Sequence, residues 1–128
     1  MPKQQKIKIL LIEDDPFLLS MYSTKFELEN FQVFSADDGQ KGLNLAFVQM
    51  PDIILLDILM PVMNGFEVLE KLKADPTTRA IPVIMLTNLN QKDEIDKAIS
   101  QGAVDYLIKA HFMPSEVVEK IKAVLAKA

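Results

Sequence analysis

Apolar residues gather in five short segments along the chain, and a longer segment of mixed polarity follows each of them. The first apolar segment is nearly all aliphatic, which is typical of a strand that is covered on both faces. The third is the most uniformly apolar and is therefore expected at the centre of a sheet. The predicted strands are Ile7 to Ile12, Phe31 to Ala36, Ile53 to Asp57, Pro82 to Thr87 and Val104 to Lys109.

Each predicted strand is followed by the signals of a helix. Asp15 and Pro16 supply a capping side chain and a first-turn proline, and Asn64 with Gly65 supplies a turn before the third helix. Gly102 provides the turn that leads out of the fourth helix. The predicted helices span Phe17 to about Glu29, a cap at Asp37 or Asp38 to a stop before Pro51, Phe66 to Ala74, Gln91 to Gln101, and Pro114 to Ala126.

The alternation of strands and helices predicts an α/β fold. No hairpin signal joins two strands, and a crossover between parallel strands is right-handed and about a dozen residues long. A doubly wound parallel sheet with helices on both faces satisfies these conditions. The chain has 128 residues and shows no linker, repeat or low-complexity tract, so residues 1–128 are expected to form a single domain.

Composition excludes several classes of function. The net charge of −4 argues against direct nucleic-acid binding, which needs clustered Lys and Arg. The absence of cysteine removes disulfides, thiolate nucleophiles and cysteine-ligated zinc. The longest apolar run, Ile53 to Val62, is interrupted by Asp57 and is too short for a membrane span. Without a secretory signal pattern, a cytoplasmic location is expected.

Acidic, hydroxyl and amine side chains lie where the predicted strands end. Glu13 and Asp14 follow the first strand, Asp57 ends the third, Thr87 the fourth and Lys109 the fifth. Each has an ordinary structural explanation on its own, such as capping a helix or facing solvent. Ligands bind at the carboxyl ends of strands in folds of this kind, however, so five such residues at one edge indicate a functional site.

Three carboxylates at this edge require a cation. At about 5 Å they repel each other by roughly 3 kcal/mol per pair at an effective dielectric constant near 20. Magnesium prefers oxygen ligands, and the strand ends offer no histidine or cysteine that would favour zinc. With the metal bound, Asp57 can attack phosphorus and form an acyl phosphate, whose oxygens need the cation, the Thr87 hydroxyl and the Lys109 ammonium.

These motifs resemble the receiver domains of two-component response regulators over essentially the whole chain. The resemblance implies the flavodoxin-like (βα)5 fold with strand order 2-1-3-4-5, and Mg2+ as the cofactor. The matching segments are Ile9 to Pro16 (ILLIEDDP), Asp52 to Pro61 (DIILLDILMP), Met63 to Gly65 (MNG), Val83 to Thr87 (VIMLT) and Gly102 to Lys109 (GAVDYLIK).

The resemblance also implies a role for each acid. Glu13, Asp14 and Asp57 would hold magnesium together with the backbone carbonyl of Leu59, while Asp15 would remain a helix cap. Asp57 would accept the phosphoryl group from the phosphohistidine of a sensor histidine kinase. The chain would not be a conventional enzyme: it would phosphorylate itself from a phosphodonor with magnesium and then slowly lose the phosphoryl group.

Such a domain signals through a change in the conformation of one of its surfaces. By the resemblance, Thr87 would bond one phosphate oxygen and Lys109 would pair with another, and Thr87 and Tyr106 would form the switch. The surface of helix four, strand five and helix five would then signal to a downstream protein or effector domain. Dimerisation on phosphorylation is a further expectation, and no direct contact with nucleic acid or membrane is expected.

Two positions depart from the family pattern. Ala110 follows Lys109 where most members have proline, and a cis bond before alanine costs about 3 to 4 kcal/mol against about 0.5 to 1 before proline. Asn88 follows the threonine where a very small residue is usual. Leu59 and Leu89 would flank the phosphate, and the hypothesis is that they shield the acyl phosphate from water; simple packing is the alternative.

Three other functions are alternatives to this one. An aspartate-nucleophile phosphohydrolase commonly has a second acid two residues after the nucleophile, where this chain has Leu59. A flavin or nucleotide binder would need a glycine-rich or hydroxyl-rich loop after the first strand, where this chain has acids. A receiver-like interaction module that has lost phosphorylation, or a designed scaffold on the same fold, is the remaining alternative, and Ala110 leaves room for it.

Overall fold

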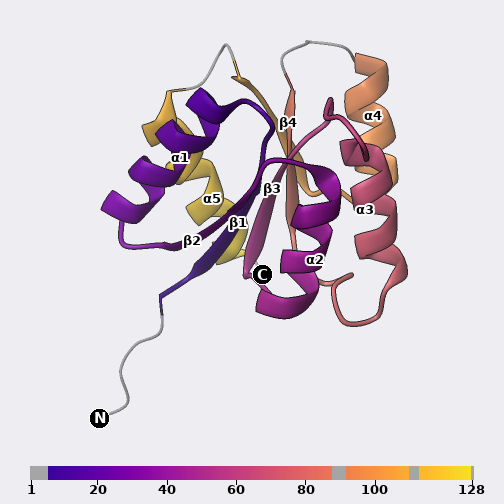
Figure 1. Cartoon of the computed structure of the whole chain (residues 1–128), viewed down its shortest axis with the longest axis horizontal. Coiled ribbons are helices and arrows are strands. Elements are labelled where there is room, and N and C mark those ends of the chain that lie inside the picture. Colours follow the sequence, from indigo (N-terminus) through magenta and orange to yellow (C-terminus); the bar gives the residue numbers. More distant parts are fainter. Residues whose placement is uncertain (1–5, 88–91, 110–112, 128) are drawn as a thin grey trace.

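The computed structural model describes residues 6–87, 92–109 and 113–127, and within these ranges five strands and five helices alternate along the chain (Figure 1). The alternation predicted from the apolar pattern is therefore confirmed. The strands are β1 (Lys8–Ile12), β2 (Gln32–Ala36), β3 (Ile53–Asp57), β4 (Val83–Thr87) and β5 (Asp105–Ile108). The helices are α1 (Pro16–Leu28), α2 (Gly39–Gln49), α3 (Gly65–Ala74), α4 (Lys92–Ser100) and α5 (Pro114–Ala126).

The strands form one parallel sheet in the order β2-β1-β3-β4-β5, as expected. The chain leaves β1 toward β2 on one side, and it then crosses to β3 and continues toward β5 on the other side. The strand order therefore reverses between β1 and β3, which is where a ligand crevice forms in open α/β sheets. Ile12 pairs with Leu56, and Asp57 pairs with Leu86, so the carboxyl ends of β1, β3 and β4 lie side by side.

Helices cover both faces of the sheet: α1 and α5 lie on one face, and α2, α3 and α4 lie on the other (Figure 1). Successive side chains of a strand point to opposite faces, so each buried strand feeds both layers of the core. In β1, for example, Ile9 and Leu11 pack under α1 and α5, whereas Leu10 and Ile12 pack under α2 and α3. This explains why β1 and β3 are almost uniformly apolar in sequence.

Side-chain caps fix where the helices begin. The Asp15 carboxylate accepts two backbone N–H bonds at the start of α1, and Asn64 and Glu67 form a reciprocal capping box at the start of α3. Of the two candidates before α2, Asp38 is the cap, because its carboxylate accepts from the backbone N–H of Lys41 at 2.8 Å. The helices thus begin directly after their capping residues, one residue earlier than predicted for α1 and α3.

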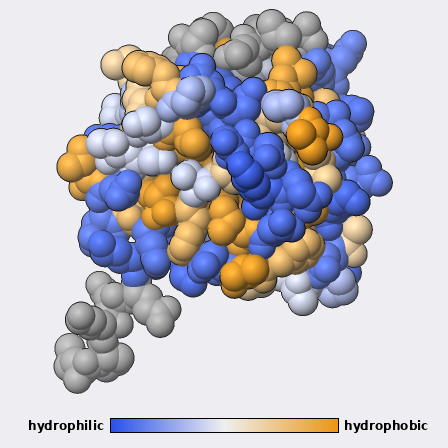
Figure 2. Space-filling model, in the orientation of Figure 1, coloured by the Kyte–Doolittle hydropathy of each residue, from blue (hydrophilic) through white to orange (hydrophobic). Residues whose placement is uncertain are grey.

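The surface mixes polar and apolar side chains (Figure 2). Val48 and Met50, at the end of α2, are among the exposed large hydrophobic residues. No helix within the described ranges has both the length and the apolar character that a membrane crossing requires.

Candidate functional site

A cavity of about 240 Å³ opens at the carboxyl ends of β1 and β3, where the strand order reverses. The five strand-end residues that the sequence singled out all line it, so the structure brings them together as predicted. The lining residues are Glu13, Asp14, Asp15, Leu18, Asp57, Ile58, Leu59, Thr87 and Lys109.

Three of the residues that line this cavity are acids. Glu13 is fully buried and Asp57 nearly so, whereas Asp14 is exposed. One carboxylate oxygen of each lies within 4.8 Å of those of the other two. Glu13 is fixed by its backbone N–H, which donates to the carbonyl of Ala36 at 3.0 Å and so continues the pairing of β1 with β2.

The turn after β3 holds the Asp57 backbone in place. The backbone N–H of Gly65 donates to the carbonyl of Ile58 at 2.8 Å, which folds the start of α3 against the end of β3. A Cβ at position 65 would meet the Asp57 carbonyl and would lie 2.8 Å from the Ile58 Cα. Glycine is therefore required here by the close approach of two backbone segments.

Lys109 supplies the positive charge of the site. It follows β5 directly, at the edge of the sheet, and its side chain extends to β1 and β3 with only 5% of its surface exposed. The ammonium pairs with Glu13 Oε1 and lies 3.1 Å from Asp57 Oδ2. Burial opposes the charge of Lys109, but the bond to Glu13 and the charge of Asp57 outweigh it and raise the pKa of the lysine.

Burial and neighbouring charges determine the charge state of Asp57. Burial, followed by the nearby charge of Glu13, raises the pKa of Asp57 to about 8, although the Lys109 ammonium acts in the opposite direction. In the absence of a metal ion, Asp57 is therefore mostly protonated at neutral pH, and Lys109 balances the charge of Glu13 alone. A further positive charge would keep Asp57 ionised and ready to act as a nucleophile.

The donor atoms fit a hard divalent cation. Glu13 Oε1 is buried and touches the Lys109 ammonium, but it has no well-directed hydrogen bond among the described residues. Carboxylate oxygens are the ligands that magnesium prefers, and here three of them lie within 4.8 Å of one another. The described side chains that line the cavity include no histidine, and the sequence has no cysteine.

The two switch residues predicted from the resemblance lie in different surroundings. Thr87 is buried at the end of β4 and lines the cavity. Tyr106 is half-buried on β5, packs against the core layer of α2, α3 and α4, and does not line the cavity. The Lys120 ammonium lies 5.9 Å from the centre of the Tyr106 ring. The residues Asn88, Leu89, Gln91 and Ala110, on which other expectations rested, lie outside the described residues.

Sequence reasoning missed one link between the first helix and the acids. Asp15 is the cap of α1, as expected, but its own backbone N–H also donates to Glu13 Oε2 at 3.0 Å. Leu18, one turn into α1, lines the same cavity. The spacing of Asp15 and Leu18, three residues apart on a helix that starts at the site, is the signal that could have identified Leu18.

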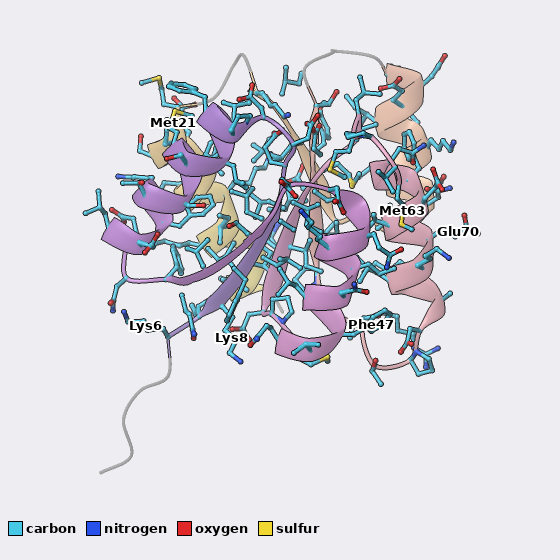
Figure 3. The ribbon with its side chains drawn as sticks, in the orientation of Figure 1. Lys6, Lys8, Met21, Phe47, Met63 and Glu70 are labelled. Atoms are coloured by element: carbon cyan, nitrogen blue, oxygen red, sulfur yellow. The ribbon has the colours of Figure 1, made fainter. Side chains whose placement is uncertain are left out.

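The loop between β3 and α3 contains a strained residue beside the site. Val62 has φ of 70° and is 84% exposed, and the Met63 backbone N–H donates to the Pro61 carbonyl at 2.7 Å. This is a tight three-residue turn in a conformation that β-branched residues rarely adopt. The side chain of Met63 packs against the core near α3 (Figure 3).

Relieving this strain should stabilise the protein. Replacing Val62 with glycine removes a conformational penalty of about 1 to 3 kcal/mol and adds an entropic cost of about 0.5 to 1 kcal/mol, so we expect a net gain of about 1 kcal/mol. Urea unfolding measures this change in the free energy of unfolding. Val48→Gly is the matched control: Val48 is also exposed, but it lies within α2, where glycine should destabilise. A loss of stability in both variants would contradict the assignment of strain to Val62.

Comparison with known proteins agrees with this geometry. The family model described as the response regulator receiver domain matches residues 9–122. The DNA-binding dual master transcriptional regulator RpaA of Synechocystis is 38% identical over 120 residues, which cover 94% of this chain and 49% of RpaA. The protein PilH of Pseudomonas aeruginosa is 37% identical over 119 residues, which cover 93% of this chain and 98% of PilH.

Solved structures share the fold closely. The chemotaxis protein CheY4 of Vibrio cholerae superposes with a TM-score of 0.88 at 27% identity, covering 94% of this chain and 99% of CheY4. The chain thus spans about half the length of RpaA but nearly all of PilH and CheY4.

Proposed function

Because this chain belongs to the response regulator receiver domain family, we propose that it is the phosphoacceptor of a two-component system and takes a phosphoryl group onto Asp57. The buried ammonium of Lys109 pairs with two buried carboxylates, those of Glu13 and Asp57. This is the single observation that carries the proposal. A purely structural site would be expected to balance its buried charges.

The proposed reaction is a displacement at phosphorus. An Asp57 carboxylate oxygen attacks the phosphorus of a phosphohistidine on a sensor histidine kinase, and the phosphorus–nitrogen bond breaks. The imidazole leaves with the electron pair and takes up a proton. The product is an acyl phosphate on Asp57, and hydrolysis of that bond would later return the carboxylate and inorganic phosphate.

Side chains of the cavity would stabilise the transferred group. The Lys109 ammonium already lies 3.1 Å from Asp57 Oδ2, and it would pair with one phosphoryl oxygen. Thr87, buried at the end of β4, would donate its hydroxyl to another. The Lys109 ammonium is already beside Asp57, so it would need little rearrangement as charge develops on the oxygens.

Glu13, Asp14 and Asp57 would hold a magnesium ion, with the Leu59 backbone carbonyl as a further ligand. Bound there, the ion supplies positive charge to the phosphoryl oxygens and to the acid cluster. The exposed Asp14 leaves an open side through which the phosphodonor can approach.

The proposed output passes through the surface of α4, β5 and α5. Loading of Asp57 would draw the Thr87 hydroxyl toward the phosphoryl group, and Tyr106 would change position as the neighbouring space changes. The altered surface would then bind an effector domain, a downstream protein or a second copy of the chain. RpaA is named as a DNA-binding transcriptional regulator, but we propose no direct nucleic-acid contact for this acidic chain.

Incubation with magnesium and a small phosphodonor tests the proposal. We expect mass spectrometry to show an adduct of one phosphoryl group that maps to Asp57 and depends on magnesium. Beryllofluoride, a non-hydrolysable mimic, should raise the melting temperature only when magnesium is present. The absence of both effects would favour the alternative, an interaction module that keeps the fold without phosphorylation.

The lifetime of the acyl phosphate should depend on Leu59. This side chain is 58% exposed and lines the cavity, so it covers part of the approach to Asp57. We expect Leu59→Asn to shorten the phosphoryl lifetime severalfold, because a polar side chain can guide water to the acyl phosphate. Loss of labelled phosphate over time measures this. Leu28→Asn, at an exposed position on α1, is the control; an unchanged lifetime in Leu59→Asn would leave packing as the role of Leu59.

A further inference from the structure

A second cavity lies at the edge of the sheet where β4 and β5 begin, opposite the edge that carries the acids (Figure 1). Its volume is about 390 Å³, which is in the range of small-molecule binding pockets. Asp105 opens β5 and lines this cavity, whereas Lys109, directly after β5, lines the acid site. Extended chain between these two residues spans about 13 Å, so the second cavity is separate from the first.

One wall of the second cavity is apolar. Ala80 and Pro82 come from the loop between α3 and β4, Val104 directly precedes β5, and Val124 lies in the last turn of α5. Val104 is 49% exposed, so part of this apolar surface is open to solvent. Apolar surface in a concave site favours a ligand with an apolar body.

The same cavity carries more positive than negative charge. Lys73, Arg79 and Lys127 line it, and Asp105 is the one acid among its described lining residues. Asp105 is already engaged, because one carboxylate oxygen lies 3.2 Å from the Lys120 ammonium and the other accepts from the next backbone N–H at 2.8 Å. Within the described part of the chain, neither the Arg79 guanidinium nor the Lys127 ammonium forms an ion pair. The cavity therefore favours an anion, although the net charge of the chain is −4.

Backbone carbonyls hold the ammonium of Lys73 in place. It donates to the carbonyls of Arg79 and Ile81, each at 2.9 Å, which leaves one of its three N–H donors for a ligand. Burial lowers the pKa of Lys73, and both of these partners are neutral. An anion in the cavity would therefore favour the charged form of this lysine.

The loop that carries Arg79 is ordered by its own hydrogen bonds. Thr78 is fully buried, and its hydroxyl donates to the Leu72 carbonyl at 2.8 Å. The Ile81 backbone N–H donates to the Thr78 carbonyl at 3.0 Å. A site that is formed before the ligand arrives loses less entropy when the ligand binds.

We propose that this cavity binds a small organic phosphate, in which a phosphate group is attached to a flat apolar ring. The planar Arg79 guanidinium offers parallel N–H donors to two phosphate oxygens, and the ammonium groups of Lys73 and Lys127 add the charge that balances a dianion. The ring would lie on the apolar wall that contains Val104 and Val124. This site goes beyond the proposed function and does not depend on phosphorylation of Asp57.

Naphthyl phosphate is the probe, and naphthol and inorganic phosphate each supply one half of it. In metal-free protein, we expect naphthyl phosphate to bind about tenfold or more tightly than either half, because only the whole molecule uses both the apolar wall and the cations. NMR titration should shift the backbone amide signals of Val104 and Asp105 rather than those of Asp57 and Ile58. No saturable binding, equal affinities for naphthyl phosphate and inorganic phosphate, or shifts confined to the acid cluster would overturn the proposal.

Arg79→Gln tests the contact with the phosphate. Arg79 is exposed, and its bond with Lys73 uses only its backbone carbonyl, so the substitution should preserve the fold. We expect the affinity for naphthyl phosphate to fall about tenfold and the affinity for naphthol to stay unchanged. Lys71→Gln is the matched control, because it removes an exposed cation of α3 that does not line the cavity. Equal losses in the two variants would show diffuse attraction by surface charge and would overturn the proposal.

Val104→Asn tests the contact with the ring. We expect it to weaken naphthyl phosphate severalfold and to leave the affinity for inorganic phosphate unchanged, because it removes apolar surface and no charge. Val48→Asn, at an exposed position on α2 outside the cavity, is the control. If Val104→Asn bound naphthyl phosphate as tightly as the unaltered chain does, the ring would not lie on this wall, and the proposal would fail.

Discussion

Asp57→Asn is expected to abolish the phosphoryl adduct and, in metal-free protein at neutral pH, to raise stability. The adduct is lost because the amide is not a nucleophile. Stability rises because a buried carboxylate crowded by Glu13 is replaced by a neutral group of the same size. We expect a gain of about 1 to 3 kcal/mol, since the loss of the ion pair with Lys109 offsets part of the relief.

The gain should depend on pH in a defined direction. Folding raises the pKa of Asp57 from 3.8 to about 8, so the folded state disfavours the ionised carboxylate. Below pH 4 the carboxyl is protonated in both states, and the substitution should change stability little. As the pH rises from 4 to 8, the unaltered protein should lose stability relative to Asp57→Asn, and the difference should be largest above pH 8.

Urea unfolding at several pH values, with a chelator present, measures this difference. Added magnesium should reduce the difference in stability between the two proteins. The cation neutralises the carboxylates of the unaltered protein and has fewer ligands in the variant. The control is Asp52→Asn, at a position outside the cavity where Asp52 accepts from the Lys8 backbone N–H at 2.8 Å. A lower stability of Asp57→Asn than of the unaltered chain at pH 8 would show that the acid cluster is not strained.

The fold could be predicted from the sequence because two independent signals agree. The apolar segments mark the strands, and capping residues such as Asp15 and Asn64 mark the helix starts. The parallel arrangement then fixes which side chains meet, because all strands end at the same edge. This is why the sequence alone predicts that Glu13, Asp57 and Lys109, which are far apart in the chain, meet at one site.

The partners within the cavity could not be predicted in the same way. Strand ends give the position of Lys109 but not the direction of its long side chain, which lies across the sheet and pairs with Glu13 as well as Asp57. Val62 carries none of the glycine or asparagine signals that normally mark a positive φ.

Lys109→Met should lower stability, whereas Asp57→Asn should raise it. The lysine variant should also change the affinities for magnesium and beryllofluoride strongly. The substitution leaves Glu13 and Asp57 buried without their shared cation, while methionine keeps most of the apolar length of the side chain. Removing one partner of a buried ion pair typically costs about 3 to 5 kcal/mol. We expect a loss near 3 kcal/mol at pH 8 in metal-free protein, because Asp57, whose pKa is already raised to about 8, can take up a proton.

The same variant should bind magnesium more tightly and beryllofluoride more weakly. Glu13 Oε1 is paired with Lys109 in the structure, so a cation that takes this oxygen must first break that pair. Without the lysine this competition disappears, and the affinity for magnesium should rise about tenfold or more. The mimic loses its ammonium partner, so its affinity should fall.

Calorimetric titration with magnesium and then with beryllofluoride separates the two effects. Lys25→Met, which removes a partly exposed ammonium that pairs with Glu29, is the control for loss of a positive charge elsewhere on the domain. An unchanged magnesium affinity in Lys109→Met would mean that the lysine does not compete for Glu13. If the affinities for magnesium and for beryllofluoride both fell, Lys109 would instead be needed to hold Glu13 and Asp57 in the geometry that binds the cation. The two buried carboxylates would then depend on the lysine to stay in place before any metal binds.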